Sequence, residues 1–103
     1  MDYKLLRKYA VEQKAERGFD YLFQKESIDT RAALPYVVWS QKDFLIQSIK
    51  FTVAKISREK GFSAAIILLL CVYYVLDVNP LHKCSVIINH LFVDVISDET
   101  QVL

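Results

Sequence analysis

A chain of 103 residues that is 53% hydrophobic, 24% charged and formally +1 at pH 7 is expected to form one domain over residues 1–103, and not a disordered protein. The mild charge argues against a nucleic-acid partner, which calls for a basic stripe. Because so short a chain has a high surface-to-volume ratio, its hydrophobic content predicts apolar surface that is exposed or covered by a partner.

The distribution of charge bears on a partner, and the cysteine content and the N-terminal residues bear on the compartment. Residues 1–60 hold 12 of the 13 basic residues but only 8 of the 12 acidic ones, an asymmetry that can orient a partner protein. Cys71 and Cys84 are the two cysteines, fewer than a small secreted domain usually needs. The N-terminal residues lack the apolar stretch of a signal peptide. We therefore expect a cytoplasmic protein with reduced thiols.

The first predicted element is an amphipathic helix over residues 2–17. Leu5, Leu6 and Tyr9 recur at helical spacing. Gly18 predicts a kink or a break, followed by a second helix or a bent continuation over residues 19–26.

The segment from residue 27 to residue 40 has no clear pattern. Within it, "YVVW" at 36–39 is rich in residues that favour strands, but no partner strand is obvious in the sequence.

Residues 41–60 carry the clearest helical signals. Leu45, Ile49 and Val53 form one stripe at helical spacing. Ser40 resembles a capping residue before this stretch, and Gly61 resembles a helix-ending residue after it. We therefore expect a helix over residues 41–60.

An uncharged run from Ala64 to Leu76 predicts the central helix, over residues 64–77. Thirteen residues in a helix span about 20 Å, less than the roughly 30 Å of a bilayer's hydrocarbon core. The run therefore favours a buried core helix over a membrane span. An embedded membrane segment over residues 62–78 remains the alternative.

Asn79 and Pro80 suit the start of a last helix, over residues 80–97. The same stretch contains many β-branched residues, so a short β-like C-terminal part is an alternative. The expected fold is an all-α bundle of four to five helices around residues 64–77, with an α+β fold as the lesser alternative.

No pattern in the sequence indicates catalysis, a cofactor or a metal. His82, Cys84 and His90 lie near one another but lack the spacing of zinc ligands. Cys71 lies in the most apolar segment and is expected to be buried and inert. A small enzyme or nucleic-acid factor using His82, Lys83 and His90 is the remotest reading.

Apolar residues on the polar sides of the expected helices predict a partner surface. Phe44 and Phe51 lie opposite the stripe of helix 41–60, and charged side chains flank them. Aromatic residues rimmed by charge are typical of protein interfaces. Val86 and Val93 form a second apolar pair of this kind, in the last predicted helix. The expected partner-binding residues are Phe44, Phe51, Lys55, Arg58, Val86 and Val93.

We expect a non-enzymatic protein-binding module, a small cytoplasmic inhibitor or adaptor that binds itself or another protein, and a homodimer is one form this can take. Toxin-neutralising immunity proteins are one class of this size. The expectation rests on size and on the lack of catalytic patterns. A membrane-associated protein using residues 62–78 is the second reading.

Overall fold

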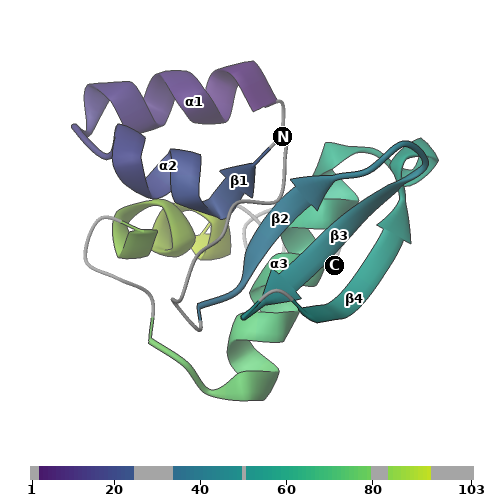
Figure 1. Ribbon diagram of the computed structural model, residues 1–103. Coiled ribbons are helices and arrows are strands. Elements are labelled where there is room, and N and C mark those ends of the chain that lie inside the picture. Colours follow the sequence, from purple (N-terminus) through teal and green to yellow (C-terminus); the bar gives the residue numbers. More distant parts are fainter. Residues whose placement is uncertain (1–2, 25–33, 50, 80–83, 94–103) are drawn as a thin grey trace, which may run out of the picture.

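The computed structural model describes residues 3–24, 34–49, 51–79 and 84–93. They form a four-stranded mixed sheet with helices packed against it (Figure 1). The predicted all-α bundle is therefore wrong. The α+β alternative placed its strands in the C-terminal part, where residues 84–93 are helical instead.

The sheet has the strand order β1-β2-β3-β4. β1 runs parallel to β2, whereas β2–β3 and β3–β4 are antiparallel. The strands are β1 (Phe23–Gln24), β2 (Tyr36–Trp39), β3 (Asp43–Ser48) and β4 (Phe51–Ser57).

The helix predicted over residues 41–60 is wrong, because this segment is the β3–β4 hairpin. Alternate side chains of β3 point into the core, as in a strand: Phe44 and Ile46 are buried, and they pair with Ile56 and Ala54 on β4. The side-chain period is thus two rather than 3.6. β3 is also the strand partner that "YVVW" lacked, since β2 pairs with it along its whole length.

Two helices precede the sheet, α1 (Tyr3–Glu12) and α2 (Glu16–Leu22). The prediction of two helices in this region is confirmed, but the break falls at residues 13–15 rather than at Gly18. The second helix ends at Leu22 instead of continuing to residue 26, because Phe23 and Gln24 form β1. Lys14 lies in this break and has a positive φ of 57°. Gly18 lies inside α2 and is buried.

A short 3-10 turn, η1 (Arg58–Lys60), leads from β4 into α3 (Phe62–Leu76). The prediction of a helix in the uncharged run is therefore confirmed. Its position is not that of a bundle centre, because α3 packs on the sheet with one side only. The buried residues of α3 are Ala65, Ile66, Leu69, Leu70 and Tyr73.

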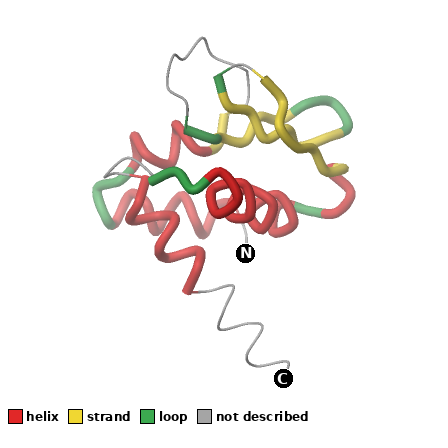
Figure 2. Tube along the Cα trace, turned by 90° about the horizontal axis from the view of Figure 1, so that it is seen from below, coloured by secondary structure: helices red, strands yellow, loops and turns green. Residues whose placement is uncertain are grey.

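The predicted last helix is confirmed over residues 84–93, and residues 80–83 and 94–97 lie outside the described part. This segment lies beside α1 and α2 (Figure 1): His90 stacks on Tyr9 with ring centroids 3.8 Å apart, and the Cys84 Sγ is 3.7 Å from the Gly18 carbonyl oxygen. Figure 2 shows the strands in one layer and the helices in another.

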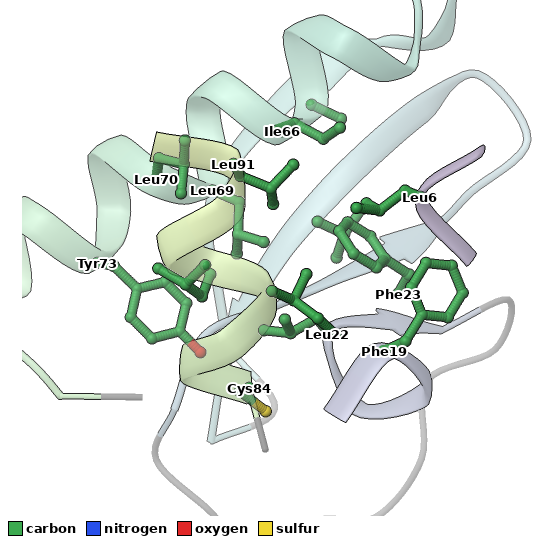
Figure 3. Close-up of a cluster of buried hydrophobic side chains, with 14 of the residues drawn as sticks. Leu6, Phe19, Leu22, Phe23, Ile66, Leu69, Leu70, Tyr73, Cys84 and Leu91 are labelled. Carbon is green, nitrogen blue, oxygen red and sulfur yellow. The ribbon is translucent and has the colours of Figure 1, made fainter. Parts of the chain in front are cut away.

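The core lies between these two layers. In Figure 3 the side chains of Leu69, Leu70 and Leu91 lie together, so α3 and the segment 84–93 contribute to one cluster. Deep in this core the Tyr73 hydroxyl donates a hydrogen bond of 2.8 Å to the Pro35 carbonyl oxygen. The loop that enters β2 is thereby tied to α3.

Aromatic rings close the core at the end of the sheet near η1. Trp39 packs edge-on against Tyr3 and Phe44 and stacks with Phe62, with ring centroids 5.4–5.9 Å apart. Such tilted and stacked pairs add stability beyond the area they bury. The rings come from α1, the sheet and α3, so the cluster joins the two layers.

Candidate protein interface

The predicted partner residue Phe44 is buried, with 5% of its surface exposed. Its ring packs against Trp39 and Phe62, and the Arg58 guanidinium carbon lies 6.0 Å from the ring centroid. Phe44 therefore belongs to the core, and its assignment as a contact residue is wrong. The helix on which it was paired with Phe51 does not exist.

Phe51 is exposed as predicted, with 73% of its surface open, at the start of β4. Ile49 at 51% and Val53 at 48% are exposed beside it in the sequence. We call Ile49, Phe51 and Val53 the apolar tip, because Ser48 pairs with Phe51 across the hairpin turn. Hairpin turns usually carry Gly, Asn or Asp at this place.

The turn of the apolar tip is strained. Ile49 has a φ of 50°, which puts its branched Cβ in the left-handed region that non-glycine residues avoid. Such a conformation costs of order 1–3 kcal/mol and persists where surrounding structure imposes it. The tip is therefore kept apolar at a cost to stability.

Basic side chains follow the apolar tip along the chain, with Lys55 on β4 and with Arg58 and Lys60 on η1, at the end of that strand away from the tip. Lys55, Arg58 and Lys60 are exposed, and Glu59 is the one acidic residue among residues 51–60. The Arg58 guanidinium also donates a hydrogen bond of 3.0 Å to the Ser40 carbonyl oxygen, which fixes its position.

β4 is an edge strand of the described sheet, but two features limit strand pairing along it. A bulge follows Ile46, so that Val53 has no partner of its own on β3. Lys55 lies further along the same strand, and bulges and lysines are both common devices that protect an edge. β4 thus offers side chains to a partner more readily than backbone.

The outer side of α3 was missed by the sequence prediction. Ile67 is 48% exposed, Tyr74 81% and Val75 76%, and Cys71 is also exposed. We call these four residues the outer face of α3. The expected burial of Cys71 is therefore wrong. The signal was present in the sequence: a run without charge predicts an apolar outer side as well as an apolar inner one.

Val86 and Val93 lie on the helical segment 84–93, where Val86 is half-buried and Val93 is 62% exposed. Phe51 and Lys55, in contrast, lie on β4. These predicted partner-binding residues therefore come from two different elements. Between this segment and the end of α3 is an open pocket of about 510 Å³. The pocket is lined by Tyr73, Tyr74, Val75, Asp77, Val78, Ile88, Asn89 and Phe92.

Cys71, Cys84 and His90 are the histidine and cysteine residues that the structure describes. His90 is half-buried against Tyr9, while His82 and Lys83 lie outside the described residues. Burial raises the pKa of the Cys84 thiol to about 11, which keeps it protonated and unreactive at neutral pH. Across the described ranges no three His, Cys, Asp or Glu side chains are grouped as metal ligands.

In the part of the chain that the structure describes, no helix has the length and apolarity needed to cross a membrane. The sequence matches no protein family, and no curated protein or solved structure shows significant similarity to it.

Proposed function

We propose that this protein is a non-enzymatic binding module that contacts another protein through the apolar tip of its β3–β4 hairpin. The observation that supports this most is the exposure of Ile49 and Phe51 on a strained turn. Neither side chain is buried, so burial in the core does not offset the energetic cost of the strained turn. Exposed apolar groups kept at an energetic cost are characteristic of contact sites.

The chemistry of the surface indicates what kind of partner would fit it. The apolar tip suits an apolar cleft, and the exposed Lys55 further along β4 suits an acidic group beside that cleft. The bulge and Lys55 favour contact through side chains over extension of the sheet. A small inhibitor or adaptor in the cytoplasm acts in this way, and toxin-neutralising immunity proteins are one such class.

The test begins with capture from the native cells and identification by mass spectrometry, using the wild-type protein and Phe51→Ser in parallel. The matched control is Leu5→Ser, since Leu5 is 65% exposed on α1, outside the hairpin. The partner should be recovered with the wild type and with the control, and lost with Phe51→Ser.

Affinity measurements with the purified partner make the test quantitative. Phe51→Ser should weaken binding by at least about tenfold, as expected for an aromatic anchor. Lys55→Gln should mainly slow association, and this effect should fade at high salt. A partner that binds Phe51→Ser as tightly as the wild type would show that the tip is not the contact site.

A further inference from the structure

No other part of the described chain covers the outer face of α3, which is a second exposed surface, distinct from the apolar tip. Its residues Ile67, Cys71, Tyr74 and Val75 are exposed and follow the spacing of one helical stripe. From Phe62 to Leu76 the helix has no charged residue. We propose that a second copy of this chain covers this face, with the two α3 helices antiparallel about a two-fold axis at Cys71.

The stripe has the symmetry that such a pairing needs. In a two-fold interface, a residue on one side of the axis meets the residue equally far on the other side in the second copy. Ile67 and Val75 lie at equal sequence distances from Cys71. Antiparallel pairing therefore brings Ile67 against Val75 of the second copy at both ends, and Cys71 against itself at the centre.

The charges at the two ends of α3 are complementary in this arrangement. Asp77 follows the last residue of α3 and is exposed. The first turn of α3 follows the exposed Lys60, and its N-cap, Gly61, makes no side-chain capping hydrogen bond. Helix N-termini carry partial positive charge. Antiparallel pairing places each Asp77 beside the first turn of the other α3.

The exposed area suits a small interface. With Tyr74 81% exposed, Val75 76% and Ile67 48%, the stripe offers on the order of 500 Å² per copy, so a pair buries about 1,000 Å², the lower end for specific interfaces. A dissociation constant on the order of micromolar is expected for such an area. Helices that lie on membranes carry Lys or Arg beside their apolar face, and α3 has neither.

The experiment measures the mass of the full chain by analytical ultracentrifugation from about 1 to about 100 µM, a range around the expected dissociation constant. The wild type should shift towards twice the 12.0 kDa of one chain. Val75→Arg should remain monomeric. The double variant Ile67→Glu, Val75→Arg should dimerise again, because each new glutamate then faces a new arginine. Circular dichroism confirms that the variants are folded.

Cys71 gives an independent test of the axis. Two antiparallel helices about 9–10 Å apart, each with a Cα radius of about 2.3 Å, bring facing Cα atoms to about 4.4–5.4 Å, which a disulfide spans. Diamide should join two copies: the two Cys71 thiols lose two protons and two electrons, which diamide takes up as it becomes the hydrazine. Cys71→Ser should abolish this cross-link and leave the dimer intact.

The outcomes separate this inference from the proposed function. Phe51→Ser should leave dimerisation unchanged, since Phe51 lies on β4. A wild-type monomer at the highest concentration, or a dimer that Val75→Arg does not weaken, would overturn the pairing. A monomer that instead sediments with phosphatidylcholine vesicles would also overturn it and assign the face to a lipid surface.

Discussion

Replacing Leu69 with alanine measures how firmly α3 is held in the core. Leu69 has 0% of its surface exposed and belongs to the main hydrophobic cluster. Removing three carbons from a fully buried site loses about 2.4 kcal/mol of transfer free energy at about 0.8 kcal/mol per carbon. The cavity adds to this loss, so the free energy of unfolding should fall by about 3–5 kcal/mol.

Leu76→Ala is the matched control, because it makes the same change on the same helix at a site that is 45% exposed. About half of the transfer term is then lost, roughly 1 kcal/mol. Urea denaturation gives both values, and an unchanged m-value confirms that only stability has changed. Equal losses for Leu69→Ala and Leu76→Ala would refute the packing of α3 described above. Leu69→Lys should prevent folding, since it buries an unpaired charge.

Tyr73→Phe should cost about 1–3 kcal/mol in urea denaturation because it leaves the buried Pro35 carbonyl unpaired. Tyr36→Phe should be neutral or stabilising, since the buried Tyr36 hydroxyl has no hydrogen-bond partner among the described residues. At concentrations well below the dissociation constant of the proposed dimer, a thiol reagent should label Cys71 in the native protein and Cys84 only after unfolding. Two protected thiols under those conditions would contradict the exposure of α3. Because burial raises the Cys84 pKa from 9.0 to about 11, this thiol contributes full stability below about pH 9 and loses it as the pH rises towards 11. Melting temperatures from pH 8 to pH 11 should therefore fall less steeply in Cys84→Ser than in the wild type. Ile49→Asn should raise the melting temperature by relieving the strained turn, and a lower value would show that Ile49 contributes to the fold.

The helices α1 and α3 were predictable because their signals are local. α1 has one apolar stripe, and α3 has a long uncharged run between Gly61 and Asp77. The hairpin was not predictable in the same way. The spacing of Leu45, Ile49 and Val53 matches a helix by coincidence, and Ile49 occupies a turn position where Gly or Asn would have indicated a hairpin. Pairing of β3 with β2 and β4 decides the structure, and the side-chain spacing within residues 41–60 does not reveal it.

The candidate surface was predictable only in part. Phe51 and Lys55 are exposed as expected, but their exposure comes from an edge strand and not from a helix face. Phe44 was misplaced because the helical period put it on the polar side, whereas strand alternation directs it into the core. The outer face of α3 was missed because a helix that is apolar all round is ordinarily buried all round.

The contacts between the first helix and the segment 84–93 also bear on how the chain folds as it is synthesised. Leu6 and Ala10 share a core with Ile87 and Leu91, residues from opposite ends of the sequence. Until the ribosome has released Leu91, the apolar sides of α1 and α3 have no complete cover. Contacts of such long sequence separation form slowly and leave apolar surface open to aggregation. The nascent protein is thus expected to expose apolar surface of α1 and α3 until residues 84–93 have left the ribosome.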